Sequence, residues 1–521
     1  MEGADNVGNA DQKVMNRGLV VVGAILIQLC LGAIYAWSVF TPPLSAKEPS
    51  DVEAAYKAPQ LGLDQADYDK MAAELSGPKQ ALARVRAAVF AETDQAKKDL
   101  LKAEQKLLAG GVNTIVRKYV PDERLRALAF GFNNTQTQAV FAAGLAAFAV
   151  VMVVAGRMMP KVGPRKLVIA GGLVLGAGYA LAGLINGTSV VALLILIGIV
   201  GGAGIGLGYV VPIAVGVKWF PDKKGLITGL AVAGFGFGAL LWIQLAGSWG
   251  QLIARNGLGA TFIIYGVTFA VACVIGSLWM KNPPEGWRPP GWSPPAPSAG
   301  GKAHAGSIDF TSSQMLAKPQ FYMIFLCFAV GAGAGLMSIG LMKSFPPKAL
   351  VTGGVDPVVA SGIAGTAMAV FFSLANGLGR IIWGTISDKL GRKSSILLML
   401  AAQGVLVICF QWMAGNEYLL YLGSALIGFN FGGNFALFPT ITADTFGTKY
   451  LAQNYGWVFL SYGVGGIAGP LLGGALGDMG NFPLAFTICG VLCLVAAGVI
   501  VMVRHPKVAT RLARRAAPQA P

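Results

Sequence analysis

The chain contains about twelve apolar runs, each roughly 20 residues long, with short polar segments between them. A hydrocarbon layer about 30 Å thick is crossed by roughly 20 apolar residues in a helix. Hydrophobic residues make up 55% of the chain and charged residues 12%, and the mean hydropathy is +0.62. Because a water-soluble globule could not bury that much apolar surface, the sequence predicts an all-α polytopic membrane protein.

The apolar runs divide into two groups of six. Those of the first group lie near residues 19–41, 135–155, 167–186, 190–216, 225–247 and 258–280. Those of the second group lie near residues 320–342, 358–386, 394–412, 418–442, 452–477 and 483–503. Segment 281–319 is rich in Pro, Gly and Ser and is predicted to be a linker. We therefore expect two six-helix halves, 19–280 and 320–503, with polar tails at 1–18 and 504–521.

A repeated loop supports this division. The string GRMMPKVGPRK at 156–166 recurs as GTISDKLGRK at 384–393, about 228 residues later. In the first copy, Pro160 and Pro164 occupy positions that carry charged residues in the second. The halves therefore look like a duplication, and parallel repeats of this kind usually enclose a substrate site at the middle of the membrane.

The net charge of +16 is spread over many loops. Segments on the side of the N-terminus hold 22 Lys and Arg, whereas the short loops on the other side hold 3. This bias predicts cytosolic termini and a cytosolic linker. Nucleic-acid binding is a poor interpretation, because the basic residues are dispersed and have no aromatic partners arranged as a stacking groove.

The polar segment 45–132 separates the first two apolar runs. Because it follows a single span from a cytosolic N-terminus, it is predicted to lie on the extracytoplasmic side of the membrane. Its Ala, Lys, Glu and Leu content over 66–108, interrupted at 76–78 by Ser-Gly-Pro, predicts an amphipathic helical hairpin. This insert is either a solvated cap or a module that binds a partner or captures substrate.

Catalytic and metal-binding patterns are missing from the sequence. All six cysteines lie inside apolar runs without a C-x-x-C pair, and His304 and His505 lie far from any Cys or carboxylate cluster. No Ser-His pair, Cys-His pair or deep carboxylate pair is available. We therefore expect neither an enzyme nor a bound cofactor or metal. The first run, 19–41, is too long for a signal-peptide core and is expected to remain as a membrane anchor.

Arg380 is the most informative residue, since every other basic residue falls in a loop, a tail or the insert. It lies eight residues before Asp388, which places it about 12 Å inside the membrane boundary. Burying a lone arginine there costs at least about 2.5 kcal/mol, and no Asp or Glu lies deep in any run. A planar guanidinium matches a carboxylate in two-point geometry, so the missing counter-ion is predicted to be a carboxylate substrate. Alternatively, helix carbonyls and Asn376, one turn earlier, hold Arg380 as a structural pin.

Several strings resemble those of a known transporter family. They are GAIYAWSVF at 32–40, WFPDKKGLITGLAVAGFGFG at 219–238, NPPEGWRPPGW at 282–292, NGLGR at 376–380 and NYGWVFLSYG at 454–463. With the charged loop at 384–393, they resemble the oxalate/formate antiporter family of the major facilitator superfamily, which is related to the monocarboxylate transporters. The likeness covers the whole chain except the insert and implies twelve transmembrane helices in two halves.

The resemblance implies particular site residues. The family's substrate-binding arginine and its neighbouring asparagine carry over onto Arg380 and Asn376. The cavity aromatics carry over onto Tyr35, Trp37, Tyr209, Phe431, Phe435 and Phe459, and Tyr462 supplies a further hydroxyl. The signature loop carries over onto Gly384, Asp388, Lys389, Gly391, Arg392 and Lys393, which we expect to tie helix ends together and stabilise one gate state.

Departures from the family pattern narrow the substrate. Oxalate-exchanging members have a lysine where Tyr462 stands and a polar amide where Ile34 stands. With one buried charge the cavity suits one carboxylate, because a dianion would leave its second charge unpaired. The sequence therefore predicts a transporter of monocarboxylates of the formate, lactate or pyruvate class.

The sequence leaves open two alternative functions and the way in which transport is coupled to a second ion. One alternative is an oxalate/formate-type exchanger that uses the tyrosine hydroxyls, and another is a non-transporting receptor or scaffold that uses the insert. Monocarboxylate transporters have an aspartate where Asn376 stands, so both proton symport and anion exchange remain possible. We expect a monomer in a cell membrane, with a small carboxylate and a proton or counter-anion as its partners.

Overall fold

The computed structural model describes residues 15–504, apart from 93, 187, 248, 293–307 and 343–344. His304, His505, the centre of the linker and nearly all of both tails therefore lie outside the described residues. Within the described ranges the regular elements are helices. Eleven of them are long and apolar enough to cross a membrane, by length and composition. A further 30-residue helix, α20, packs among them and carries Asn430 and Asn434 in its apolar stretch.

Six of the long helical segments come from the first half of the chain. They are α1 (Arg17–Leu31) with η1 (Gly32–Val39) and α2 (Thr41–Ser45), α8 (Asn134–Val162), α9 (Pro164–Leu184), α10 (Val190–Leu193) with η2 (Leu194–Gly201) and α11 (Gly202–Trp219), α12 (Lys224–Ala246), and α13 (Leu252–Ser277). The first segment narrows into a 3₁₀ helix at η1, whereas η2 is a π-helical stretch.

The second half supplies six more. They are α15 (Pro319–Leu341), α17 (Pro357–Thr366) with η3 (Ala367–Phe372) and α18 (Ser373–Leu390), α19 (Arg392–Met413), α20 (Glu417–Phe446), α21 (Leu451–Asp478) and α22 (Phe482–Met502). The stretch η3 is again π-helical, and two short helices, α14 (Ser312–Leu316) and α16 (Phe345–Thr352), lie beside them.

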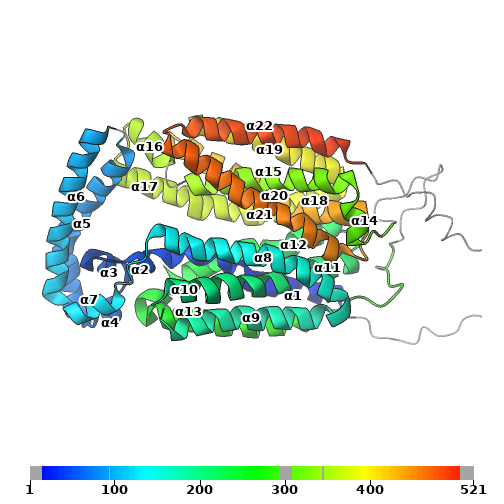
Figure 1. Ribbon diagram of the computed structural model, residues 1–521, viewed down its shortest axis with the longest axis horizontal. Helices are drawn as coiled ribbons and strands as arrows, with labels where there is room; N and C mark the ends of the chain where they lie inside the picture. The colour runs from blue at the N-terminus through cyan, green and yellow to red at the C-terminus, as the bar shows by residue number, and fades with distance from the viewer. Residues whose placement is uncertain are drawn as a thin grey trace, which may run out of the picture.

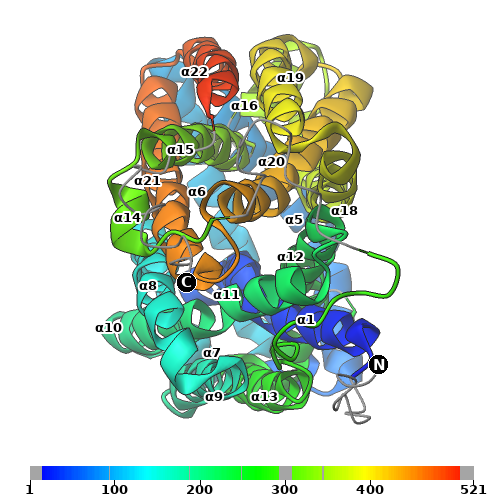
Figure 2. The ribbon, with the colours of Figure 1, turned by 90° about the vertical axis from the view of Figure 1, so that its right-hand side faces the viewer.

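The two groups form two bundles that lie side by side along the long axis of the molecule (Figure 1). Viewed from one end, α9, α13 and α1 lie on one side and α22, α19 and α15 on the other (Figure 2). The bundles meet where α12 packs against α18 and α8 packs against α21. All-helical packing is what a lipid environment requires, because every backbone group is then bonded within its own segment.

Glycines allow the bundles to meet backbone to backbone. A Cβ added at Gly225 of α12 would lie 2.1 Å from the carbonyl oxygen of Gly384 in α18. A Cβ added at Gly156 of α8 would lie 2.3 Å from the carbonyl oxygen of Ala452 in α21. Small residues commonly mediate close helix packing in membranes, and here they bring the two halves together at one end of the molecule.

The repeated loop has the same backbone shape in both halves. Gly163 joins α8 to α9 with φ 88° and ψ 153°, and Gly391 joins α18 to α19 with φ 83° and ψ 154°. Glycine adopts a positive φ without the steric cost of a Cβ. The two copies thus share a turn geometry as well as sequence letters.

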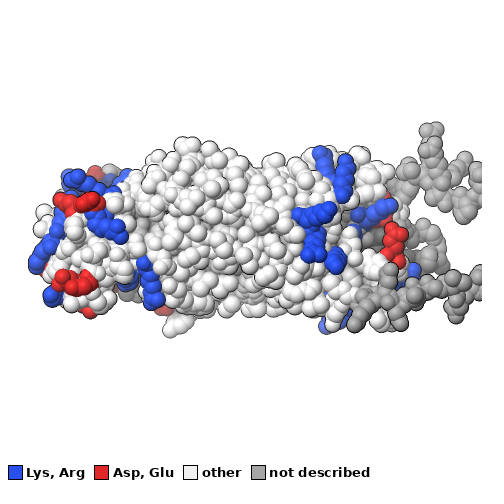
Figure 3. Space-filling view, turned by 90° about the horizontal axis from the view of Figure 1, so that it is seen from below, with Lys and Arg blue, Asp and Glu red and all other residues white. Residues whose placement is uncertain are grey.

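Charged side chains gather at the two ends of the molecule and leave a wide uncharged belt between them (Figure 3). We call the end at which α14 lies the linker end, and the opposite end, at which α5 (Gln65–Ala91) and α6 (Gln95–Tyr119) lie, the hairpin end (Figure 1). An uncharged belt is what the hydrocarbon layer of a membrane requires.

The insert forms five helices at the hairpin end. They are α3 (Pro49–Ala55), α4 (Ala58–Leu61), α5 (Gln65–Ala91), α6 (Gln95–Tyr119) and α7 (Asp122–Leu128). The helices α5 and α6 form a hairpin that stands across the ends of both bundles (Figure 1). The insert reaches the first bundle where α4 packs against α13, and the second where α5 packs against α16 and α17.

The sequence predicts the break in the insert at residues 76–78, and that prediction is wrong. The helix α5 continues through Pro78, and the chain reverses between Ala91 and Gln95. Pro78 removes one helical hydrogen bond and frees the carbonyl of Glu74, but Glu74 is exposed, so water can satisfy that carbonyl. Buried Met71, Leu75 and Leu82 then hold α5 together on both sides of Pro78.

Candidate functional site

Arg380 lies on α18 where the two bundles meet, and it is fully buried. Its Nε donates to Asn376 Oδ1 at 3.3 Å, one turn earlier on the same helix. One terminal nitrogen donates to the carbonyl of Val232 at 2.9 Å, on α12 of the other half. The second terminal nitrogen, NH2, is buried and has no hydrogen-bond partner. The structural-pin contacts that the sequence suggested are therefore present, and they leave one donor group of the guanidinium unused.

Aromatic rings from both halves surround this guanidinium. Its carbon lies 4.2 Å from the ring centroid of Phe435 on α20 and 5.8 Å from that of Phe235 on α12. A cation over an aromatic face is attracted by the ring quadrupole, and this attraction strengthens when water is excluded. The rings therefore hold the cation in place without neutralising its charge.

Tyrosine hydroxyls line the same region. Tyr35 of η1 and Tyr462 of α21 are joined by a hydrogen bond between their hydroxyls, which links the two halves. The Tyr209 hydroxyl on α11 is buried close to Arg380 without a partner at hydrogen-bonding geometry. The Tyr455 hydroxyl on α21 is likewise buried without a partner. These hydroxyls and the NH2 group of Arg380 are donors that a bound anion could use.

Most of the predicted aromatic residues lie together. The ring of Tyr209 lies 5.2 Å from those of Phe235 and Phe459, and Phe459 lies 5.2 Å from Tyr462. Phe435 lies 5.3 Å from Tyr462 and from Phe431. The structure therefore groups Arg380 and Asn376 with the rings predicted on η1, α11, α20 and α21.

Trp37 is placed differently from the other predicted residues. Its Nε1 donates to the carbonyl of Thr137 at 2.8 Å, and its ring packs against Phe40 at 5.9 Å. The first contact joins η1 to α8, and the second joins Trp37 to the residue that follows η1, so both lie within the first half. The structure therefore shows Trp37 as a packing residue beside α8, apart from the rings around Arg380.

Sequence reasoning missed several rings of the cluster. Phe235 contacts Arg380 and Tyr35, and Phe148 lies 5.0 Å from both Tyr209 and Phe459. Phe235 stands within the glycine-rich string GFGFG at 234–238, and small residues commonly mark close helix packing in membranes, so its neighbouring Gly236 was a usable signal. Gly236 faces Arg380, since a Cβ there would lie 3.3 Å from the Nε atom. Phe148 carries no such signal.

The charged loop at the linker end joins the two halves. The Asp388 carboxylate accepts from the backbone N–H groups of Gly225 and Leu226, both at 2.8 Å, at the start of α12. Carboxylates are favoured at helix N-termini, where unpaired N–H groups and the helix dipole are positive. Arg392 pairs with Asp388 at 2.7 Å and with Asp444 at 3.0 Å.

A second cation reaches the same carboxylate from the other half. Lys224 of α12 pairs with Asp444 of α20 at 2.7 Å, and both side chains are less than a fifth exposed. Lys389 and Lys393 are exposed, whereas Gly384 and Gly391 supply the close approach and the turn. Asp444 and Lys224 were missed from the sequence, because nothing local distinguishes them from other charges at helix ends.

The fold and its charged ends describe a multi-pass membrane protein made of two six-helix halves around a buried cationic site. The sequence profile of the Major Facilitator Superfamily matches residues 123–369 and 345–521, and the chain belongs to that superfamily of transporters. It is thus a membrane transporter and not an enzyme, and its superfamily carries small molecules, sometimes with a proton or counter-anion.

Two curated relatives show where the chain lies within the superfamily. It is 29% identical over 342 residues to the oxalate:formate antiporter of Oxalobacter formigenes, which covers 66% of this chain and 76% of that protein. It is 23% identical over 365 residues to the apicoplast pyruvate carrier 1 of Toxoplasma gondii, covering 61% of this chain and 66% of that protein. The predicted relationship to carboxylate transporters is therefore confirmed at modest identity.

A solved structure supports the fold alone. The human organic anion transporter MFSD10 (TETRAN) aligns over 93% of this chain and 100% of its own, with a TM-score of 0.56 and 13% sequence identity. At that identity the likeness concerns the helical arrangement, which agrees with the two bundles described above.

Proposed function

We propose that this transporter carries small carboxylates, with the substrate carboxylate bound at Arg380. The observation that supports this proposal is the buried NH2 group of Arg380, which has no partner although Nε and NH1 are bonded. A buried cation without a counter-ion costs at least about 2.5 kcal/mol in a membrane interior. A carboxylate would accept from NH2 and offset that cost.

The charge count favours a monocarboxylate over a dicarboxylate. Among the described residues Arg380 is the one fully buried basic side chain, and Tyr462 supplies a hydroxyl in place of a second cation. A dianion would leave one carboxylate without a charged partner in a water-poor site, which is costly. The relatives named for formate and pyruvate transport agree with this class, although one of them is also named for oxalate.

The surrounding hydroxyls would help the site to bind a carboxylate in preference to a halide ion. The hydroxyls of Tyr209 and Tyr455 are buried without partners on two different helices from opposite halves. An extended anion can accept from Arg380 and from one hydroxyl at once. Alternating contact with the two halves would then couple binding to their relative movement.

We also propose that the linker end faces the cytosol and the hairpin end faces outward. By sequence, the segments expected on the side of the N-terminus, with the linker and both tails included, hold 22 Lys and Arg, against 3 in the short loops expected on the other side. Cytosolic loops carry such an excess. Substituted-cysteine labelling of exposed Arg165 and exposed Lys106 with an impermeant reagent in intact cells tests this orientation, and labelling at Arg165 would overturn it.

The decisive experiment is uptake of labelled formate, lactate, pyruvate and oxalate into proteoliposomes, with and without a pH gradient. We expect saturable monocarboxylate uptake that Arg380→Ala reduces at least about 100-fold, because it removes the charged partner of the substrate. Arg380→Lys keeps the charge without the planar fork and should retain partial activity. Arg165→Ala, which removes an exposed arginine, serves as the matched control.

Two outcomes would contradict the proposal. Normal uptake by Arg380→Ala would show that Arg380 acts only as a structural pin, and dominant oxalate uptake would refute the one-charge argument and favour an exchanger. The pH gradient separates the coupling modes, since symport responds to it and simple anion exchange responds to the internal counter-anion.

A further inference from the structure

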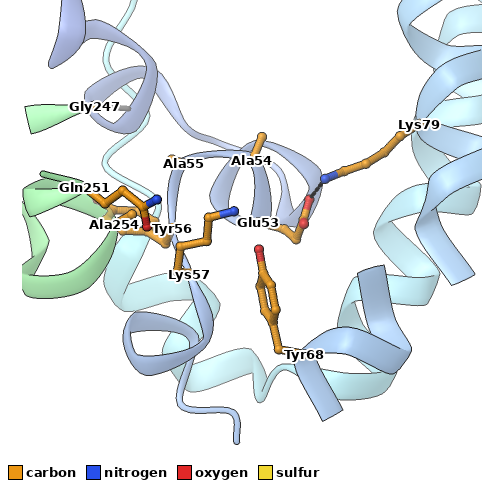
Figure 4. Close-up of a pocket in the computed structure, with 10 residues that line it drawn as sticks. All are labelled: Glu53, Ala54, Ala55, Tyr56, Lys57, Tyr68, Lys79, Gly247, Gln251 and Ala254. Carbon is orange, nitrogen blue, oxygen red and sulfur yellow. Dashed lines mark ion pairs between the residues drawn. The ribbon is translucent and has the colours of Figure 1, made fainter. Parts of the chain in front are cut away.

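A cavity lies at the hairpin end, between the base of the insert and the first bundle. Its volume is about 420 Å³, which is within the range of small-molecule sites. Its walls come from the end of α3, from α5 and from the turn between α12 and α13, which lie far apart in the sequence (Figure 4). The cavity is distinct from the site around Arg380, because the two share no lining residue.

Polar side chains converge on this cavity. The Lys57 ammonium and the Tyr68 hydroxyl both point toward its centre (Figure 4). The Lys57 nitrogen lies 5.6 Å from the centroid of the Tyr68 ring. The backbone N–H of Lys57 donates to the carbonyl of Ala254 at 3.4 Å, which ties this residue to the first bundle. Two donor side chains therefore face one space from opposite walls, and Lys57 is exposed to solvent there.

The charges around the cavity sum to one excess positive charge. Glu53 is 4% exposed and forms an ion pair with Lys79, so these two neutralise each other. Lys57 forms no ion pair within the part of the chain that the structure describes. A partly enclosed cavity with one uncompensated ammonium and a neighbouring hydroxyl suits a small anion.

The backbone at the third wall is strained. Gln251, which lines the cavity from the turn before α13, has φ 50° and ψ 31°, in the left-handed region. This conformation is uncommon for residues other than glycine, asparagine or aspartate, and such strain concentrates at functional sites. The strained turn directs the Gln251 side chain to the cavity wall, where its amide can donate a further hydrogen bond (Figure 4).

We propose that this cavity is a second carboxylate-binding site, in which Lys57 and Tyr68 hold a small carboxylate at the hairpin end before it reaches Arg380. The inference rests on the proposed function, since it assumes the same class of anion. The ammonium supplies the charge, the Tyr68 hydroxyl donates to a carboxylate oxygen, and Gln251 closes the site from the first bundle. A cationic site at an entrance raises the local concentration of anions.

Binding to a variant that lacks the central cation tests this proposal. We would record saturation-transfer NMR spectra of pyruvate with purified Arg380→Ala protein, a method suited to weak binding. We expect a pyruvate signal that falls at least about 5-fold in Arg380→Ala/Lys57→Gln, because an ammonium contributes most of the anion affinity. The double variant with Lys106→Gln removes an exposed lysine of α6 and should keep the signal.

A signal that is absent from Arg380→Ala, or equally strong after Lys57→Gln, would overturn the second site. This failure is separable from failure of the proposed function. If wild-type protein takes up no monocarboxylate but Arg380→Ala still binds pyruvate through Lys57, then the transport proposal is wrong and the cavity remains an anion site.

Transport kinetics give an independent test that does not depend on Arg380 variants. Lys57→Gln should raise the KM for external carboxylate about 3- to 10-fold and leave kcat unchanged, and the difference should shrink at high salt because exposed charges are screened. Tyr68→Phe, which keeps the ring packing, should raise the KM less. An unchanged KM in both variants, or a fall in kcat alone, would refute the proposal.

Discussion

The two ends of the molecule join its halves in different ways. At the linker end, opposite charges meet across the interface, with Lys224 paired to Asp444 and the Asp388 carboxylate bound to the start of α12. At the hairpin end, the insert packs against both bundles, and burial, with a smaller contribution from the positive charge of Lys98 on α6, lowers the pKa of Lys348 on α16. At the linker end the halves attract each other directly, whereas at the hairpin end they are connected through the insert.

This difference indicates which movement is easier. To open the linker end, the protein must separate the Lys224–Asp444 ion pair, the hydrogen bonds of Asp388 to the start of α12, and the glycine contacts of α12 with α18. To open the hairpin end, α5 must part from α16 and α17, while the base of the insert stays fixed to the first bundle by bonds such as that of Gln60 to the carbonyl of Arg255. We therefore expect the insert to move together with the first half.

The largest effect is expected where the backbones touch. Gly225→Val places side-chain atoms against the Gly384 carbonyl, since even a Cβ would lie 2.1 Å from that oxygen. Overpacking of this kind costs about 1–3 kcal/mol, so transport should fall roughly 5- to 150-fold. Uptake of labelled carboxylate into proteoliposomes measures this fall in transport. The matched control is Gly362→Ala, whose Cβ meets open space; equal losses in the two variants would refute the role of the linker-end contact.

The charge joint at the linker end should give the next largest effect. Asp444→Asn removes the carboxylate that binds both Lys224 and Arg392, and hydrogen bonds to charged groups are worth about 1.5–3 kcal/mol. We expect the linker end to open more often, seen as at least about 5-fold faster thiol labelling of a cysteine placed at buried Ala443. Asp99→Asn on α6 is the control, and unchanged labelling would contradict the joint.

A charge reversal at the hairpin end should have a smaller effect of the opposite kind. Lys98→Glu replaces repulsion of Lys348 by attraction, and exposed pairs contribute about 0.2–1 kcal/mol, so carboxylate uptake should slow roughly 1.5- to 5-fold at low salt. The slowing should vanish at high salt. Lys106→Glu, on the same helix, controls for the added charge; equal slowing there would show that Lys98 has no special position.

The smallest effect concerns pH. Burial, and to a lesser extent the Lys98 charge, lowers the pKa of Lys348 below its ordinary value. The pKa of Lys348 is therefore lower in the folded protein than in the unfolded chain, which means that folding disfavours its charged form. The contact of α5 with α16 should then become more stable as the pH rises through this lowered pKa. Limited proteolysis of the hairpin should slow above that pH. Lys98→Gln should shift this change to higher pH; no shift would exclude the interaction.

The sequence was sufficient for the membrane fold and for the choice of Arg380. The apolar runs predicted an all-α chain, which the helices and the superfamily match confirm. Arg380 could be singled out because a cation in an apolar run has no local explanation. The site residues themselves stay predictions, although the structure brings most of them together and places Trp37 elsewhere.

Other features could not be found because they depend on contacts between distant segments. Lys224 and Asp444 are ordinary charges until the fold brings their helices together. Pro78 is a helix breaker by local rules, yet buried side chains on either side of it keep α5 continuous. Gln251 gives no sequence signal at all, since its backbone conformation is imposed by the turn before α13.

The π-helical stretch η3, which ends four residues before Asn376, affects how the chain can change over evolution. A π-helical turn is wide enough to hold one residue more than an α-helical turn, so it absorbs a single insertion or deletion locally. Lineages can therefore lengthen or shorten the part of this helix that meets the hairpin while the orientation of Arg380 toward α12 is preserved. A change of length in the outer part of this helix would thus leave the cationic centre in place.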